Sequence, residues 1–244
     1  MNELVRLAEF RKILTDYHLS KTALITLSQT KLVLIIGPTS SGRNSRIKRL
    51  LKTGDYHYVV SDTTRQPRIN DGVLEQNGRE YWFRTENEIL TDLKQGKYLE
   101  AAIIHNQQVS GIGVRELEKA RDEGKIAITD TEIAGAASAI KYKPDTIVIF
   151  VLPPSFDEWQ RRIKHRGPML PEEFKRRMQS ACKEFETALS NDYFQFVIND
   201  TGDDAVMLIN QIAKLETTDP ELQNKGRALA EQLLLATRSL VSSL

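Results

Sequence analysis

The sequence has little cysteine, no long apolar run and almost no excess of charge of either sign. Cys182 is the only cysteine among 244 residues, which excludes a disulfide within the chain and favours a reducing, cytoplasmic location. No stretch approaches the roughly 20 apolar residues that a membrane span needs, so no membrane partner is expected. The N-terminal region carries Glu3, Glu9 and Asp16 without an apolar core, which is unlike a secretory signal.

The balance of charged residues limits the classes of partner. Lys and Arg total 34 against 33 Asp and Glu, a formal net charge of +1, so the chain as a whole does not attract nucleic acid or an acidic membrane. Any site for an anion must therefore be local. The hydrophobic fraction of 40% and the charged fraction of 27% are typical of a soluble globular protein, and the length suits one medium-sized domain with appendages.

Apolar runs and helical periodicities alternate along the chain. Residues 31–36 and 146–152 are short, unbroken apolar runs, which predicts strands buried on both faces. Residues 56–84 carry short β-like pieces and paired aromatic side chains instead. The remaining pattern predicts strands at 125–129 and 194–199 and helices at 45–52, 116–123, 156–165, 174–189 and from 203 onward. This order predicts an α/β domain that carries an inserted β-rich subdomain.

Both ends of the chain are predicted to be helical. Residues 1–30 show apolar side chains at spacings of three and four, and Asp219-Pro220 is a strong start for a helix that covers 219–244. The narrow apolar seam of this C-terminal helix consists of Leu222, Gly226, Leu229, Leu233, Ala236 and Leu240. A seam of this kind suits one partner helix. The helix can dock on its own domain, for instance against the N-terminal helix, or it can form a homodimer contact.

A glycine-rich segment follows the first buried strand and precedes a helix. In Gly37-Pro-Thr-Ser-Ser-Gly42-Arg43-Asn44 the glycines have the spacing of a phosphate-binding loop, whose backbone N–H groups surround an anion at a helix N-terminus. The full motif has Lys followed by Ser or Thr, whereas this chain has Arg43 and Asn44. Arg43 keeps the positive charge, and Asn44 offers an amide oxygen. A structural turn without a ligand is the alternative interpretation.

Eight segments resemble the guanylate kinases, in the same order and spacing. The phosphate-binding loop is the first, and Ser61-Asp-Thr-Thr-Arg65-Gln-Pro-Arg68 is the most specific. The others are Gly78-Arg-Glu-Tyr81-Trp-Phe83, Tyr98-Leu-Glu100-Ala, Thr129-Asp130-Thr-Glu132-Ile-Ala-Gly135, Phe150-Val-Leu-Pro-Pro-Ser155, Arg161-Arg-Ile-Lys-His-Arg166-Gly167 and Val197-Ile-Asn199-Asp200. The similarity covers roughly residues 31–215. It implies a P-loop fold, a mostly parallel sheet flanked by helices, with a GMP-binding insert near 62–112 and a helical lid near 160–178.

The resemblance implies a GMP site that elementary chemistry supports. Arg65 and Arg68 can direct two guanidinium forks onto one phosphate, and Tyr81 can add a hydroxyl donor. Glu100 carries an acceptor-only carboxylate that matches the two donors on the edge of guanine, and adenine has no such pair. The implied GMP-binding set is Ser61, Arg65, Arg68, Tyr81, Glu100, Ser110 and Asp130. The alternatives are a solvated pair for the arginines and an ordinary strand aromatic for Tyr81.

The resemblance also implies an ATP site with Mg²⁺ bridging the phosphates. Its residues are Gly37, Pro38, Thr39, Ser40, Ser41, Gly42, Arg43, Asn44 and Asn199, with Asn44 as a weak metal ligand. Around the break at Gly167-Pro168, the lid would supply Arg166 and Arg177 to the transferring phosphates, although Arg161 or Arg176 could do so instead. Arg43, Arg166, Arg177 and Asp130 form the implied catalytic set. Val109 stands where the family has a phosphate-contacting tyrosine.

The function implied is phosphorylation of GMP to GDP by ATP, a step of purine nucleotide metabolism. Two alternatives stay open. The chain could be a catalytically weakened guanylate-kinase-like module that works through protein partners, because Arg43 and Asn44 depart from the motif. It could also phosphorylate another small phosphorylated acceptor, although the guanine-matching Glu100 weighs against this.

Overall fold

The computed structural model describes every residue except 1–2, 71, 168, 201–202 and 216. The chain divides into two compact units. The first unit comprises residues 1–32, 55–129 and 137–146, and the second comprises 33–54, 130–136 and 147–244. Pro168, expected to break the lid, lies outside the described residues.

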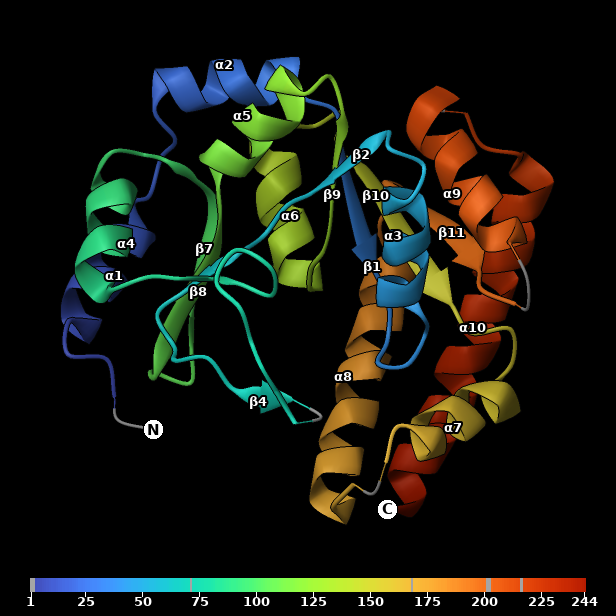
Figure 1. Ribbon diagram of the computed structural model, residues 1–244. Helices are drawn as coiled ribbons and strands as arrows, with labels where there is room; N and C mark the ends of the chain where they lie inside the picture. The colour runs from blue at the N-terminus through green and yellow to red at the C-terminus, as the bar shows by residue number, and fades with distance from the viewer. Residues whose placement is uncertain (1–2, 71, 168, 201–202, 216) are drawn as a thin grey trace. The chain divides into compact units, whose positions relative to one another are not determined.

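Parallel strands form the centre of the second unit. They lie in the order β11 (Phe194–Ile198), β10 (Ile147–Leu152) and β1 (Leu32–Ile36). The register pairs Val33 with Ile147 and Val148 with Phe194. Every residue of β1 is buried, as the unbroken apolar run predicts. The helices of this unit are α3 (Arg43–Leu51), α7 (Phe156–His165), α8 (Pro171–Leu189), α9 (Asp204–Leu215) and α10 (Pro220–Ser243), and Figure 1 shows them around the strands.

The C-terminal helix α10 docks on its own unit. It packs along α8 and β11, and the Gln223 side chain hydrogen-bonds both the N–H and the C=O of Phe196, at 2.7 and 3.3 Å. Gly226 sits so close that a Cβ there would lie 2.5 Å from the Cβ of Phe196. Leu222, placed in the predicted seam, is exposed, because the buried face of α10 runs through Gly226, Ala230, Leu233, Leu234 and Thr237. The homodimer contact stays a prediction.

A mainly antiparallel sheet dominates the first unit. Its order is β6 (Trp82–Phe83), β3 (Asp62–Thr63), β8 (Gln108–Gly113) and β7 (Tyr98–Ile104), with β3 and β6 parallel. A separate hairpin joins β4 (Ile69–Asn70) and β5 (Val73–Leu74), and β2 (Tyr56–Tyr58) pairs in parallel with β9 (Ile126–Asp130). Residues of α6 (Ile133–Tyr142) belong to both units.

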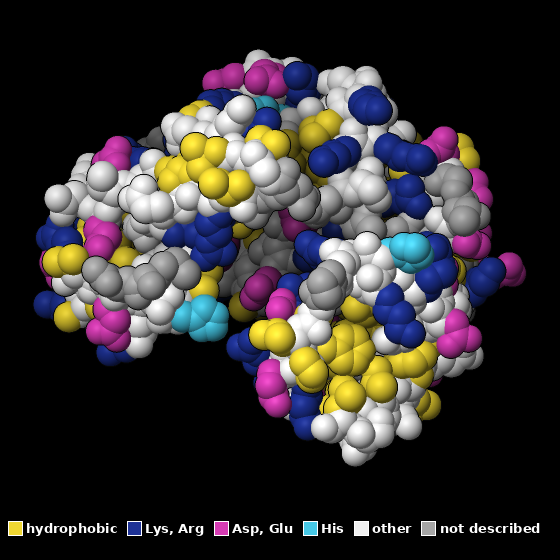
Figure 2. Space-filling view, turned by 60° about the horizontal axis from the view of Figure 1, so that its bottom comes forward, with side chains coloured by type: hydrophobic (Ala, Val, Ile, Leu, Met, Phe, Trp, Pro, Cys, Tyr) yellow, Lys and Arg dark blue, Asp and Glu magenta, His cyan; other side chains and the backbone are white. Residues whose placement is uncertain are grey.

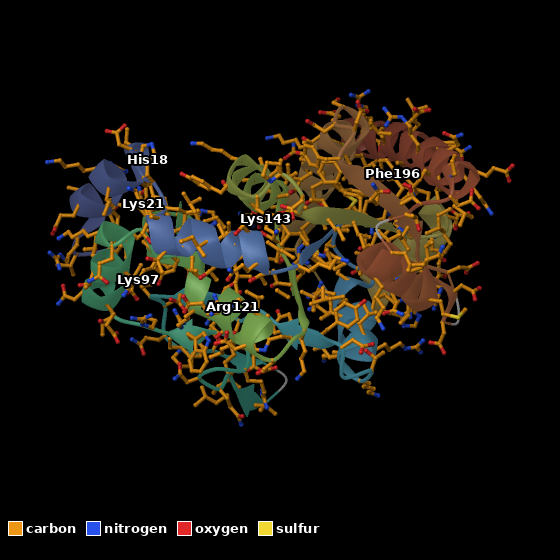
Figure 3. All side chains as sticks on the ribbon, turned by 90° about the horizontal axis from the view of Figure 1, so that it is seen from above. His18, Lys21, Lys97, Arg121, Lys143 and Phe196 are labelled. Atoms are coloured by element: carbon orange, nitrogen blue, oxygen red, sulfur yellow. The ribbon has the colours of Figure 1, made fainter. Side chains whose placement is uncertain are left out.

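The N-terminal region forms two helices rather than the continuous one predicted for 1–30. α1 (Leu7–Thr15) buries Phe10 against α4 (Glu86–Lys94) and β7, whereas α2 (Lys21–Gln29) packs on α5 (Val114–Asp122). Ser20 caps α2 by accepting a hydrogen bond from the N–H of Ala23 at 3.1 Å, which separates the two helices. Figure 3 labels Lys21 at the start of α2 and Arg121 on α5. The Arg121 guanidinium hydrogen-bonds the hydroxyl of Thr26 on α2 at 3.4 Å.

A buried carboxylate network ties the first unit together. Glu116 of α5 is 1% exposed and accepts hydrogen bonds from Lys119 at 2.8 Å, Trp82 Nε1 at 3.1 Å and the Val60 N–H at 3.2 Å. His57 Nε2 lies 3.3 Å from the same carboxylate. Burial opposes ionisation, but the hydrogen bonds from these partners outweigh it and lower the pKa of Glu116 to about 2.

Among the residues described, none of the helices combines the length and the apolar character that crossing a bilayer requires.

Candidate active site

The loop between β1 and α3 has the backbone geometry of an anion-binding loop. Gly37 and Gly42 have φ values of 149° and 100°, and Ser40 has a φ of 61°. Gly42 is the N-cap of α3, and no side chain caps this helix within the described residues. The first N–H groups of α3 therefore face the loop without a side-chain acceptor, and the positive end of the helix adds to them. This arrangement suits a phosphate.

Close contacts explain why glycine occupies the two ends of the loop. A Cβ on Gly37 would lie 2.4 Å from the carbonyl oxygen of Val151, and one on Gly42 would lie 2.0 Å from Nδ2 of Asn199. Ser40 holds a left-handed conformation that usually costs a residue with a side chain about 1–2 kcal/mol. The loop is therefore a specific, strained structure.

Two side chains hold the loop from behind. Asn199, at the end of β11, donates from Nδ2 to the carbonyl oxygen of Ser41 and accepts from Nε of Arg46 at 2.5 Å. Trp159 of α7 donates from Nε1 to the carbonyl oxygen of Thr39 at 2.7 Å. The side chain of Asn199, predicted to bind ATP, is thus engaged in supporting the loop.

Two of the predicted lid arginines converge on one atom of the loop. Thr39 Oγ1 accepts hydrogen bonds from Nη1 of Arg166 at 3.2 Å and from Nη1 of Arg177 at 3.1 Å. Arg161, the alternative, instead makes a two-bond ion pair with Glu158 at 2.6 and 2.7 Å on the exposed side of α7. Figure 2 shows Lys and Arg side chains gathered on the right-hand part of the view, which is the second unit.

Two cavities flank the loop within the second unit, and Arg43 lines both. The smaller, of about 180 Å³, is lined by Ile36, Gly37, Thr39, Arg43, Thr131, Glu132, Arg177, Ser180 and Glu184. The larger, of about 480 Å³, is lined by Ser40, Gly42, Arg43, Asn44, Ser45, Arg161, Arg162, His165 and Arg166. Arg43 Nη1 lies 3.5 Å from the carbonyl oxygen of Thr131 and 3.8 Å from Oδ2 of Asp130. The second cavity in particular is rich in cations and suits a polyphosphate.

The oxygen donors near Arg43 fit a magnesium ion held mainly by a nucleotide. Asn44 is exposed on the larger cavity, where its amide oxygen is available beside the phosphate-binding loop. In the part of the chain that the structure describes, no cluster of three or more His, Cys, Asp or Glu side chains could hold a metal. Mg²⁺ commonly keeps water and substrate phosphates as ligands and takes only one or two from the protein.

The residues predicted to bind GMP in the first unit share one face of its sheet. Thr63 lies opposite Ser110 and beside Phe83 in the strand register, and the Ser110 hydroxyl donates to Thr63 Oγ1 at 2.9 Å. Side chains two residues apart on a strand point to the same face. Two more predicted residues therefore belong to this face. Glu100 of β7 lies two residues before the strand partner of Ser110, and Tyr81 lies two residues before Phe83.

Arg65 is held on this face by stacking and by an ion pair. Its guanidinium carbon lies 4.7 Å from the ring centroid of Tyr81 and 5.6 Å from that of Phe83. Both of its terminal nitrogens donate to Glu75, at 2.5 and 2.8 Å, and this carboxylate also accepts from the N–H of Arg68 at 2.9 Å. Glu75 therefore fixes the side chain of one predicted phosphate ligand and the backbone of the other.

Ser61, Asp130 and Val109 have different surroundings. Ser61 is half-buried just before β3 and lies two residues before Thr63, so by the same spacing it belongs to this face, and its carbonyl oxygen accepts from the Trp82 N–H at 2.9 Å. Asp130 belongs to the second unit and faces Arg43. Val109 does not occupy a phosphate-contacting position, because its side chain is fully buried in the core beneath the sheet. Gln108, the neighbouring residue, shares the site face instead and donates to Ser110 at 3.4 Å.

Sequence reasoning missed Glu75, Thr63 and Glu184. Glu75 lies ten residues after Arg65, on the far side of the β4–β5 hairpin, so only a predicted hairpin would have brought the two together. Thr63 lay within the recognised Ser61–Arg68 segment. Glu184 falls inside a predicted helix, and its spacing of seven from Arg177 places both on one helix face.

Comparisons with known proteins show which family the chain resembles. The guanylate kinase family model matches residues 29–216. Guanylate kinase of Porphyromonas gingivalis is 35% identical over 188 residues, which are 76% of this chain and 95% of that protein. Guanylate kinase 1 of Oryza sativa subsp. japonica is 32% identical over 198 residues, and the match spans 80% of this chain but only 50% of the rice protein.

A solved structure supports the fold alone. The crystal structure of guanylate kinase from Anaplasma phagocytophilum superposes with a TM-score of 0.55 at 24% identity, covering 83% of this chain and 94% of that one. The family model spans most of this chain, and the matches to the bacterial relatives span most of this chain and of those proteins. The chain belongs to the guanylate kinase family, the kinases that phosphorylate GMP at the expense of ATP.

Proposed function

We propose that this chain converts GMP and ATP to GDP and ADP, with the sheet face of the first unit as its GMP site and the loop after β1 as its ATP site. The observation that carries the proposal is the shared sheet face, which gathers phosphate-binding and base-reading groups. Arg65, Tyr81, Ser110 and Glu100 lie on it. A protein that served only as a scaffold would have no use for this combination.

On the GMP side, each residue has a chemical role. Arg65, held by Glu75, donates to the phosphate with its remaining N–H groups, while exposed Arg68 adds a second guanidinium. Tyr81 contributes a hydroxyl. Glu100 accepts the two donors on the guanine edge, and Ser110 supports the base-binding side. The half-buried carboxylate of Glu100 would lose these donors with the wrong base, which would discriminate against it.

On the ATP side, the backbone of the loop binds the β- and γ-phosphates, and Arg43 supplies the positive charge. Arg166 and Arg177 exchange Thr39 Oγ1 for phosphate oxygens. Asn44 would contribute an amide oxygen to Mg²⁺, which neutralises phosphate charge when bound. Asn199 maintains the loop by its bonds to Ser41 and Arg46 rather than by touching the nucleotide.

The chemical step needs positioning more than covalent help. A phosphate oxygen of GMP attacks the γ-phosphorus, and the bond from that phosphorus to the β–γ bridging oxygen breaks to leave ADP. Negative charge accumulates on the transferring group and the leaving oxygen. Arg43, Arg166 and Arg177 stabilise this charge, which is electrostatic catalysis by preorganised donors. Asp130 orients Arg43 from the other side.

An assay of acceptor-dependent ADP release tests the proposal. GMP, dGMP, AMP, UMP and CMP are offered with ATP and Mg²⁺, and GMP is expected to give the highest kcat/KM. A preference for another monophosphate would contradict the GMP assignment. Absence of turnover with every acceptor would instead favour the binding-module alternative.

Glu100→Gln tests the base-reading role within the same assay. The amide places a donor against N1–H of guanine, so kcat/KM for GMP should fall by about 30- to 1,000-fold, equivalent to roughly 2–4 kcal/mol. The KM for ATP should change little, because Glu100 belongs to the first unit and the ATP loop to the second. An equal loss for the two nucleotides would count against the assignment.

A further inference from the structure

An acidic side chain of α8 faces the phosphate-binding loop without a complete set of partners. Arg177, Ser180 and Glu184 lie three and seven residues along the helix, and all three line the cavity of about 180 Å³ beside Arg43. Figure 1 shows α8 below α3 in the second unit. One oxygen of Glu184 accepts from the Ser180 hydroxyl at 3.2 Å.

The second oxygen of Glu184 is the unusual one. Oε2 is buried and has no hydrogen-bond partner among the residues that the structure describes. Buried polar atoms are nearly always satisfied, and an unsatisfied one typically costs about 1–3 kcal/mol. Burial raises the pKa of Glu184 and neighbouring Glu132 adds to the rise, whereas the charge of Arg43 and the Ser180 hydrogen bond lower it. The positive charge of Arg43 thus favours the ionised form of Glu184.

Arg43 in turn is only loosely held. Its guanidinium lies 3.5 Å from the carbonyl oxygen of Thr131 and 3.8 Å from Asp130, both longer than the usual 2.7–2.9 Å of a charge-assisted bond. A guanidinium has five N–H donors around a plane. It can therefore present one edge to a phosphate and another to a carboxylate at the same time, which the compact ammonium of a lysine, without a planar fork, cannot do in the same way.

We propose that Glu184 is a positioning residue that orients the Arg43 guanidinium when ATP occupies the loop. Asp130 and Glu184 line Arg43 from two elements, the end of β9 and the face of α8. In the complex, Glu184 Oε2 accepts from one edge of the guanidinium and fixes its plane, so that the opposite edge meets the phosphates. The inference rests on the proposed function, because it assigns Glu184 to the same phosphoryl transfer.

This role predicts a particular kinetic pattern. The backbone N–H groups of the loop bind ATP in the ground state whatever Arg43 does, so loss of Glu184 should affect ATP binding little. Alignment of the cation matters most as charge develops in the transition state. Glu184→Gln, of equal size but without charge, should therefore lower kcat by about tenfold, which is roughly 1.4 kcal/mol of barrier. The KM values for ATP and GMP should stay within about twofold.

A double-mutant cycle with Arg43 tests the proposal. Arg43→Gln, Glu184→Gln and the double variant are compared with wild type by steady-state kinetics, with folding checked by circular dichroism and thermal unfolding. If Glu184 acts through Arg43, Glu184→Gln should have no further effect on kcat in the Arg43→Gln background. Glu184→Asp, which keeps the charge, should retain more activity than Glu184→Gln. Glu172→Gln, an exposed carboxylate in the first turn of α8, is the matched control and should behave as wild type.

The outcomes separate this role from the proposed function. If wild type is active, two results would overturn the positioning role alone. One is a Glu184→Gln variant with unchanged kcat, and the other is a double variant whose loss in kcat equals the combined losses of the two single variants. A loss that appears only as reduced thermal stability, with kcat per folded molecule intact, would also overturn it. Wild type that does not turn over GMP would refute the proposed function, and the positioning role with it.

Discussion

Glu75→Gln should destabilise the first unit and make its stability depend more strongly on GMP. The Glu75 carboxylate accepts both terminal nitrogens of Arg65, and the two side chains are almost closed to solvent, with 6% and 7% exposed. The amide keeps one acceptor of the same shape but brings a donor against the guanidinium. Arg65 then becomes a buried cation without its counter-charge.

The magnitude follows from the burial of the pair. Removing one partner of a buried ion pair costs about 3–5 kcal/mol, and the amide oxygen recovers roughly 1 kcal/mol through one remaining hydrogen bond. The expected loss in free energy of unfolding is about 2–4 kcal/mol, or about 5–15 °C in melting temperature for a chain of this size. Asp122→Asn, which removes an exposed pair with Arg121 (side chains 67% and 33% exposed), should cost under about 1 kcal/mol.

The decisive measurement is a thermal unfolding series with GMP. If Arg65 binds the phosphate, the doubly charged phosphate supplies the counter-charge that Glu75→Gln removes. Saturating GMP should then raise the melting temperature of the variant by more than it raises that of wild type or of the Asp122→Asn control. AMP at the same concentration serves as the ligand control. A destabilised variant whose GMP shift equals that of wild type would refute the assignment of Arg65 to the phosphate.

Three further predictions concern the loop and the acid stability. Gly42→Ala should abolish most turnover, because its Cβ would lie 2.0 Å from a neighbouring atom. Gly54→Ala, with a positive φ but open space around it, should cost only about 1–2 kcal/mol of the free energy of unfolding. Equal losses of stability and of kcat in the two variants would contradict this prediction. Asn44→Ser should raise kcat by about tenfold with little change in ATP affinity, because a hydroxyl fits an octahedral Mg²⁺ better than an amide oxygen, and an unchanged kcat would show that Asn44 carries no penalty. Glu116, whose pKa is about 2 in the folded protein, contributes stability that is present above its usual pKa and is lost as the pH falls toward 2. Glu116→Gln should therefore weaken the decrease in the free energy of unfolding at acidic pH. An unchanged decrease would argue against this network.

Most of the α/β pattern could be predicted because it depends on local sequence. The apolar run at 31–36 is β1, and 146–152 contains β10, since strands buried on both faces need unbroken apolar side chains. Helix α4 was missed although Thr85 and Glu88 form a capping box that is visible in the sequence. Residues 1–30 were read as one helix because their apolar spacing continues, and Ser20 was overlooked as the cap that starts a second.

Site residues that belong to a sequence motif could be predicted, whereas the side chains that contact them in the folded protein could not. Arg65 could be assigned from its segment, but its pairing with Glu75 depends on a hairpin that the sequence shows only weakly. The burial of Val109 follows from strand parity: its neighbour Gln108 shares the face of Ser110, and a shift of one residue exchanges the two faces. A motif comparison carries no strand parity, so the burial of Val109 could not be predicted from it.

The neighbours of Arg43 in the structure suggest a different role for this arginine than its position in the motif does. As a motif position, Arg43 is a long, planar replacement for a compact cation. In the structure its neighbours include Asp130 and the cavity-lining Glu184, so part of its charge is already balanced before any phosphate arrives. Arg166 donates to the neutral hydroxyl of Thr39 and gives up little when a phosphate replaces it, whereas Arg177, which donates to the same hydroxyl, is also paired with Glu173 at 2.6 Å. Attraction of the triphosphate therefore falls mainly to Arg166 of the lid, and Arg43 acts on the charge that develops in the transition state, where its orientation by the neighbouring carboxylates matters most.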